Sequence, residues 1–318
     1  MAKNKVSRKK ILKALGKVFS KHKYFILPVI FFILVSFTLG VYVGQLSINN
    51  FQKESLASKS SLGIDLNKLQ EKVMPQKGYD FKIQWGDLGK KMVEDGVIDE
   101  VKLANAVAGS DKLPADLKKY LDGSDQKRIT VNQENAQFWV DVLWGLGLAN
   151  KNEILEKGPM QEGGNTANYA STGGYTIGKK APMELYSKFS YIKLSTKQQV
   201  LIKEIAESVY RPCCGNSTAF PDCNHGMAAL GLIELLVSQG KSKNEIYKTV
   251  LAFNSYWFPQ TYLDISYHFA KNGREYKNVK PQELLSKTFS SAMGYAVIRK
   301  QVGQIQWPAL KSGGSCGA

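Results

Sequence analysis

Residues Arg211 to Gly240 read RPCCGNSTAFPDCNHGMAALGLIELLVSQG, and this stretch decides the fold that we predict. Its second half, Met227 to Val237, is apolar except for Glu234. A helix that is apolar on every side is normally buried in the protein interior. We therefore predict a central helix that is capped by Asp222 and ends at Gly240. A buried Glu234 needs a partner, and we expect a salt bridge to Lys or Arg rather than a role as catalytic acid.

The segments on both sides of this helix predict two further helices. Ser195 and Gln198 have the spacing of a capping box, and they open a helix that should stop at Pro212. Ser242 and Glu245 form a second capping box, which opens a helix that runs to Phe258. The loop after the first helix therefore begins with the cysteines and leads directly into the central helix.

The rest of the domain is predicted to be mainly helical. Tyr79 to Trp85 alternates apolar and polar residues and is the best strand candidate, but no partner strand is evident. Thr130 to Leu148 is predicted as a helix with Thr130 or Asn132 as its N-cap. Pro281 to Gln301 is predicted to be helical as well. The fold class is thus a helical bundle with long glycine-rich loops.

The longest of these loops is Gly163 to Gly178, which is rich in Gly, Ser, Thr and Asn. The stretch Gly173 to Lys180 is close to a phosphate-binding loop, G-x-x-x-x-G-K-[ST]. Lys180 stands where the magnesium-binding hydroxyl belongs, and Pro182 interrupts the helix that should follow. We therefore expect no nucleotide, and we predict a structural loop or a lid over the cysteines.

The N-terminal part of the chain predicts a membrane anchor. Residues 24–46 contain no charged side chain, and a helix of this length measures about 34 Å, enough to cross a hydrocarbon core of about 30 Å. Nine of the sixteen net positive charges lie in residues 1–23, and cytoplasmic flanks favour Lys and Arg. A cleavable signal peptide is the rival interpretation, but its apolar region is shorter.

These features divide the chain into five parts: a cytoplasmic basic tail (1–23), a single-pass transmembrane anchor (24–46), a polar stalk (47–62), an extracytoplasmic helical domain (63–310) and a flexible tail with a cysteine (311–318). The anchor explains most of the basic charge, and no basic stripe with interleaved aromatic residues stands out elsewhere. We therefore expect no nucleic-acid partner.

Most of the recognisable chemistry lies within 13 residues, in a cluster formed by Cys213, Cys214, Cys223 and His225. Our first hypothesis is a metal site. Three thiolates and an imidazole suit Zn²⁺, and thiolates with the nearby Met227 suit Cu(I).

Two alternatives use the same cysteines without a metal. In the first, the cluster carries out thiol–disulfide exchange, with Cys316 on the C-terminal tail as a resolving thiol, and an adjacent Cys213–Cys214 disulfide would be strained and easily reduced. In the second, a disulfide between Cys223 and either Cys213 or Cys214 is a structural staple in an interaction domain, and His225 is a satisfied polar residue.

Two resemblances accompany these hypotheses. The run Cys214-Gly-Asn216-Ser217, a helix, and then Gly240 to Ile246 is similar to the helical hairpin of the cytochrome c maturation protein CcmH. That family is membrane-anchored and exported, and it handles apocytochrome thiols, so the resemblance implies a thiol- or metal-carrying protein partner.

A longer resemblance covers most of the exported part and is to a family of uncharacterised, singly anchored prokaryotic proteins. Four stretches carry it: Trp85 to Gly89, Gly173 to Gly178, Cys213 to Met227 (CC…DCNHGM) and the GGSCG run around Cys316. It implies the anchored, exported architecture and no particular activity.

Overall fold

The computed structural model describes Ser36, Gly40, residues 63–308 and Leu310. The chain divides into two units, Met1–Gly63 and Ile64–Ala318. In the first unit, Ser36 and Gly40 are helical and exposed. The second unit contains every element discussed below.

The predicted basic tail, the stalk and, apart from Ser36 and Gly40, the predicted anchor lie outside the described residues. The C-terminal tail 311–318 lies outside them as well. Among the helices that are described, none combines the length and the apolar character needed to cross a membrane.

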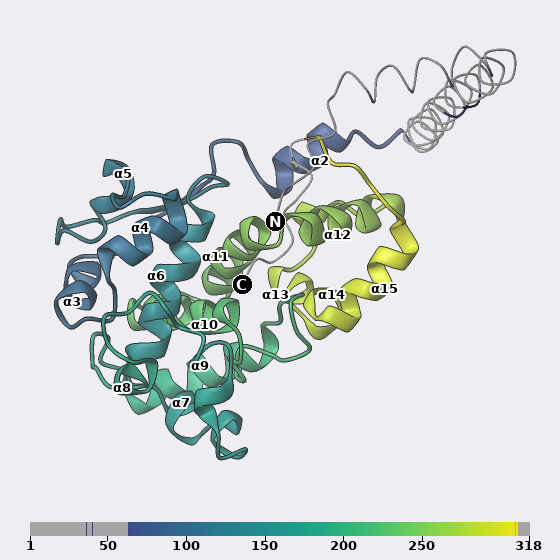
Figure 1. The fold of residues 1–318 in the computed structure, drawn as a ribbon. Helices are drawn as coiled ribbons and strands as arrows, with labels where there is room; N and C mark the ends of the chain where they lie inside the picture. The colour runs from purple at the N-terminus through teal and green to yellow at the C-terminus, as the bar shows by residue number, and fades with distance from the viewer. Residues whose placement is uncertain (1–35, 37–39, 41–62, 309, 311–318) are drawn as a thin grey trace, which may run out of the picture. The chain divides into compact units, whose positions relative to one another are not determined.

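The second unit is mainly helical, as predicted (Figure 1). Helix α10 (Asn224–Ser238) lies at its centre and packs against α6 (Ala136–Ala149), α9 (Thr196–Ser208) and α11 (Lys243–Trp257). Every residue from Gly226 to Val237 is buried, which confirms the prediction of a central helix. Both predicted capping boxes are present, at the starts of α9 and α11.

Helices α6 and α10 cross at very short range because a glycine of each faces the other helix. A Cβ atom on Gly147 would overlap with the carbonyl oxygen of Met227, and one on Gly231 would lie 2.6 Å from the carbonyl oxygen of Leu143. These are backbone atoms, so a larger residue at either position would push the helices apart.

Shorter elements surround this core: α2 (Leu66–Val73), α3 (Leu88–Glu94), α4 (Glu100–Ala108), α5 (Ala115–Lys118), α7 (Glu153–Lys157), α8 (Pro182–Leu185), α12 (Pro259–Lys271), α13 (Pro281–Leu284), α14 (Lys287–Ser290), α15 (Ala292–Val302) and the 3-10 turns η1 (Pro159–Gln161), η2 (Thr166–Asn168) and η3 (Tyr276–Asn278). Helices α3 and α4 contact α6, whereas α2 and α15 contact α12.

The strand candidate has a partner that the sequence did not reveal. β1 (Tyr79–Phe81) pairs antiparallel with β2 (Ile129–Val131), with Asp80 opposite Thr130. The guanidinium of Arg128 pairs with the Asp80 carboxylate on the exposed face of this small sheet.

The predicted start of the helix after β2 was wrong. Thr130 belongs to β2, and α6 begins only at Ala136. The side-chain oxygen of Asn132 accepts hydrogen bonds from the backbone N–H groups of Glu134 and Asn135, both at 3.0 Å. Asn side chains that bond to the local backbone in this way favour a turn over a helix.

The segment Pro281 to Gln301 is helical, as predicted, and it forms three separate helices, α13, α14 and α15. The Ser290 hydroxyl donates to the carbonyl of Leu284, and the Ser291 hydroxyl donates to that of Lys287, each at 2.6 Å. Ser291 then caps α15 by accepting from the Gly294 N–H at 3.0 Å. These local bonds break the segment into pieces.

Helix α15 is held against α12 by the fully buried Asp264. Its carboxylate accepts hydrogen bonds from Tyr295 (2.8 Å), Arg299 (2.6 Å) and the indole of Trp307 (2.9 Å). These bonds hold α15 in place, and the first residue of α15, Ala292, donates its backbone N–H to the carbonyl of Cys214.

Glu234 is fully buried, and its partners are two side-chain amides instead of the Lys or Arg that we expected. Its carboxylate accepts hydrogen bonds from the side-chain amides of Asn150 (2.9 Å) and Asn152 (2.5 Å). Burial raises the pKa of Glu234 to about 8, although both amides act to lower it. The side chain ties α10 to the end of α6.

A pH-dependent contribution to stability follows from this raised pKa. Between pH 4.5 and 8, the folded Glu234 retains a proton that the unfolded chain releases, so its contribution to the free energy of unfolding falls as pH rises through this window. Urea titrations across this range should show the wild type losing stability relative to Glu234→Gln. The matched control is Glu207→Gln on the exposed face of α9, which should follow the wild type. Parallel curves for the wild type and Glu234→Gln would contradict the assignment.

Candidate metal centre

The cysteines lie on the loop that connects α9 to α10. The loop turns back on the end of α9, because the N–H groups of Thr218 and Ala219 donate to the carbonyls of Val209 (2.8 Å) and Ala206 (3.2 Å). These bonds end α9 at Ser208, so the predicted stop at Pro212 was wrong. The fold-back brings the two ends of the loop together.

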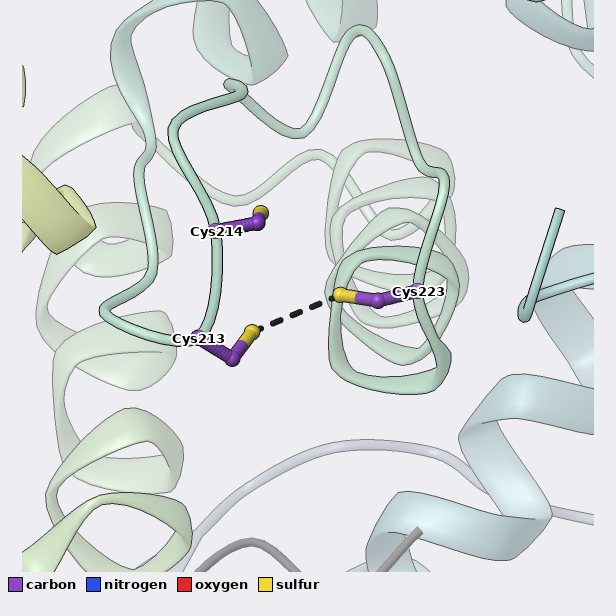
Figure 2. A group of neighbouring side chains, drawn as sticks. All are labelled: Cys213, Cys214 and Cys223. Carbon is purple, nitrogen blue, oxygen red and sulfur yellow. Dashed lines mark hydrogen bonds between the residues drawn. The ribbon is translucent and has the colours of Figure 1, made fainter.

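The three sulfur atoms gather at one point (Figure 2). The Sγ atoms of Cys213, Cys214 and Cys223 all lie within 4.8 Å of one another. Those of Cys213 and Cys223 point toward each other at 3.5 Å. Cys213 is exposed, the other two are partly buried, and none of the three is in a disulfide. The prediction that these cysteines converge is therefore confirmed.

Cys223, not Asp222, is the N-cap of α10. Its Sγ accepts a hydrogen bond from the backbone N–H of Gly226 at 3.4 Å. The predicted cap, Asp222, is engaged elsewhere: its carboxylate accepts from Arg211 at 2.7 Å and from the side-chain amide of Asn216 at 2.8 Å. The sulfur thus occupies the N-terminal end of the helix, where the helix dipole favours negative charge.

A buried arginine organises the whole loop. Only 1 % of Arg211 is exposed. Its guanidinium donates to Cys223 Sγ (3.0 Å), to the carbonyls of Asn216 (3.2 Å) and Phe220 (3.1 Å), and to Asp222 Oδ1 (2.7 Å). One side chain therefore connects the beginning, the middle and the end of the cysteine loop.

Space for this guanidinium depends on a glycine in the first turn of α10. A Cβ atom on Gly226 would lie 2.6 Å from the Nε atom of Arg211 and closer still to its Cζ. Because Arg211 is held by four hydrogen bonds, it cannot move aside without breaking them. Gly226 is therefore required by the position of Arg211.

Gly226→Ala is accordingly expected to lower the free energy of unfolding by about 1–3 kcal/mol, the usual cost of overpacking. Gly215→Ala, in the same loop, is the matched control, since a Cβ atom there would have no neighbour within 4 Å. Urea unfolding of the two variants measures the difference. Equal stability of the two variants would show that the guanidinium is not fixed as described.

The electrostatics of the cluster favour a thiolate on Cys223. Hydrogen bonds from the thiols of Cys213 and Cys214, together with the charge and the N–H of Arg211, hold the pKa of Cys223 well below its usual range, although burial acts against them. The pKa of Cys213 is raised, because its hydrogen bonds with Cys214 and Cys223 retain the proton. The cluster therefore favours a negative charge on Cys223, next to the thiols of Cys213 and Cys214.

The other predicted ligands are placed differently. His225 is not part of the sulfur group; its ring lies against Phe258, with centroids 4.5 Å apart, and its Nδ1 is 2.8 Å from Asn224 Oδ1. Burial lowers the pKa of His225 to about 4. Met227 is fully buried within the hydrophobic core. Cys316 lies outside the described residues.

Two further segments contact the cysteine loop. In the glycine-rich loop, the N–H of Ser171 donates to the carbonyl of Asp222 at 3.1 Å, and the ring of Tyr169 packs edge-on against Phe220. At the start of α15, the N–H of Ala292 donates to the carbonyl of Cys214 at 2.9 Å. The glycine-rich loop thus packs against the cysteine loop at Phe220 and Asp222.

Sequence reasoning found the cysteines but missed Arg211, Asn216 and Gly226 as parts of the site. One signal was available: Arg211 and Asp222 carry opposite charges at the two ends of the cysteine loop. Their pairing becomes evident only once the loop is known to fold back on itself.

Comparison of the chain with protein-family models, with curated proteins and with solved structures finds no match. The resemblances to the CcmH hairpin and to the singly anchored family therefore stay predictions, and the site must be interpreted from its own geometry.

Proposed function

We propose that this chain is a membrane-anchored extracytoplasmic protein that binds one soft metal ion, Cu(I) or Zn²⁺, through Cys213, Cys214 and Cys223. The observation that carries the proposal is the convergence of three sulfur atoms within 4.8 Å of one another. Three thiols gathered around one point are a suitable ligand set for these ions.

The spacing of the sulfur atoms supports this proposal. A metal–thiolate bond of about 2.3 Å places tetrahedral ligands about 3.8 Å apart. The Cys213–Cys223 separation is 3.5 Å, and no pair exceeds 4.8 Å. Small side-chain rotations therefore suffice to place the three sulfurs around one ion.

The composition of the ligand set favours Cu(I) over Zn²⁺. All three donors are soft sulfur atoms, and the neighbouring imidazole of His225 is outside the group. Structural Zn²⁺ sites are usually closed by four protein ligands, so zinc here would need a fourth ligand from water, a partner or another part of the chain. Thiolates select Cu(I) without such a requirement.

Arg211 makes this ligand set available before any ion arrives. Thiolates held close together repel one another, and the buried guanidinium offsets part of that repulsion through its 3.0 Å bond to Cys223. Hydrogen bonds to a ligand also orient it, and losing such bonds typically weakens metal binding by about 10–100-fold.

The cellular placement in this proposal rests on the sequence. The uncharged run 24–46 and the basic residues before it support a single anchor with the cysteine-bearing unit outside the cytoplasm. A protein that carries a soft metal or a reactive thiol is the class of partner that suits the exposed Cys213.

The test is metal retention by the purified, reduced full chain. After exposure to Cu(I) or Zn²⁺ and removal of free metal, native mass spectrometry should show one ion per chain, which denaturation removes. The control is the double variant Cys213→Ser/Cys214→Ser, which should retain none. Equal retention by the wild type and the double variant would refute the proposal.

A further inference from the structure

We infer that the same centre has a second activity: Cys213 and Cys223 form a reversible disulfide by exchange with an external disulfide, and this oxidation releases the metal ion. The release rests on the proposed metal binding, whereas the exchange itself does not. The inference therefore names both a regulation of the site and the class of substrate, a small-molecule or protein disulfide.

The geometry selects one pair among the three cysteines. Cys213 and Cys223 face each other at 3.5 Å (Figure 2). The thiol of Cys214 has other acceptors, Asp222 Oδ1 at 3.8 Å and the carbonyl of Asn216 at 3.9 Å. A disulfide requires about 2.05 Å between sulfurs. Cys213 and Cys223 already face each other at 3.5 Å, and a disulfide between the adjacent residues Cys213 and Cys214 would be strained.

Exposure and hydrogen bonding give the two sulfurs of the pair different roles. Cys213 is the exposed cysteine, so it is the sulfur that an external disulfide reaches. The sulfur of Cys223 accepts hydrogen bonds from Arg211 Nε at 3.0 Å and from the Gly226 N–H at 3.4 Å. It also faces the sulfur of Cys213 at 3.5 Å. Cys223 is therefore placed to attack the Cys213 sulfur once Cys213 has formed a mixed disulfide.

The exchange proceeds in two balanced steps. First, Cys213 transfers its proton to Cys223, and the Cys213 thiolate attacks one sulfur of R–S–S–R; the S–S bond breaks, RS⁻ leaves and a mixed disulfide forms. Cys223 then releases the proton, and its thiolate attacks the Cys213 sulfur, expelling a second RS⁻. Two protein sulfurs lose two electrons, the external disulfide gains them, and the two RS⁻ groups take one proton from the pair and one from solvent.

Oxidation of this pair removes two of the three proposed ligands. Cys214 would remain as a lone thiol, because the imidazole of His225 is not part of the sulfur group. A single thiolate does not retain Cu(I) or Zn²⁺ against solution ligands, so the ion leaves when the disulfide forms. Reduction by a thiol restores the three-sulfur set.

The experiment treats the metal-loaded full chain with oxidised glutathione, followed by alkylation, peptide mass mapping and measurement of bound metal. We expect one Cys213–Cys223 disulfide per ion released, and recovery of both thiols and metal binding after reduction. Cys214→Ser should still form the Cys213–Cys223 disulfide. Cys213→Ser should lose rapid oxidation and should keep Cys223 as a free thiol.

Two outcomes would overturn the inference. One is a disulfide that joins Cys214 or Cys316 to another cysteine as the main product; the other is three free thiols under conditions that oxidise an exposed dithiol. If the reduced chain binds no metal but the Cys213–Cys223 disulfide forms, the proposed function fails and the exchange activity stands. If metal binds and glutathione does not release it, the proposed function stands and the regulation fails.

Discussion

Replacing Arg211 with leucine is expected to lower the free energy of unfolding by about 3–5 kcal/mol, the cost of removing one partner from a buried ion pair. The change leaves the Cys223 thiolate without its guanidinium and leaves the carbonyls of Asn216 and Phe220 without a donor. It also leaves the Asp222 carboxylate without its cation. Buried polar groups that lose their partners destabilise the folded state.

Urea unfolding of Arg211→Leu and Arg211→Lys measures this contribution. Arg128→Leu is the matched control, because Arg128 also pairs with an aspartate, Asp80, but both side chains are about half exposed. The control should change stability little, since exposed ion pairs contribute little. Lysine keeps the charge at position 211 but cannot reproduce four hydrogen bonds, so Arg211→Lys should also be destabilised. If Arg211→Leu unfolds at the same urea concentration as Arg128→Leu, the guanidinium does not organise the loop.

Cys223→Ser is expected to weaken metal binding by more than about 100-fold, because changes to residues that merely orient a ligand already cost about 10–100-fold. Cys223 is the cysteine whose pKa is lowered, and its sulfur contacts both Cys213 and Arg211. Serine keeps the size and the position at the N-cap but supplies a hard, protonated oxygen in place of a soft thiolate. Competition against a Cu(I)-binding chelator gives the affinity of each variant.

The control variant for Cys223→Ser is His225→Phe. The imidazole packs on Phe258, and phenylalanine can occupy the same aromatic position. If only the three sulfurs bind the ion, His225→Phe should bind as tightly as the wild type. A loss of affinity in His225→Phe as large as that in Cys223→Ser would show that the imidazole joins the metal after all.

The fold was predictable where one signal dominated a long segment. The apolar run of α10 and the capping boxes of α9 and α11 are local in sequence, and each marks its element without help from the rest of the chain. Prediction failed where side-chain hydrogen bonds decide the local structure. Asn132 turns the chain before α6 through hydrogen bonds to the local backbone, which helix propensity does not describe. The C-terminal segment is helical as predicted, and the bonds of Ser290 and Ser291 set where its three helices begin and end.

The residues of the candidate site were also predictable only in part. The three cysteines were found because their residue type and spacing already indicate thiol chemistry. The role of Arg211 depends on the fold-back of the loop, which pairs Tyr210 with Ser217 and is set by contacts with the end of α9. Met227 was assigned to the site by its position in the sequence, whereas its side chain is fully buried in the core.

X-ray absorption at the metal edge of the loaded, reduced full chain tests the proposed centre most directly. We predict a first coordination shell with three sulfur atoms at about 2.3 Å, the length of a metal–thiolate bond. The shell should persist in His225→Phe and should disappear in Cys213→Ser/Cys214→Ser. A shell made of nitrogen and oxygen, or a chain that retains no metal to measure, would contradict a three-thiolate metal centre.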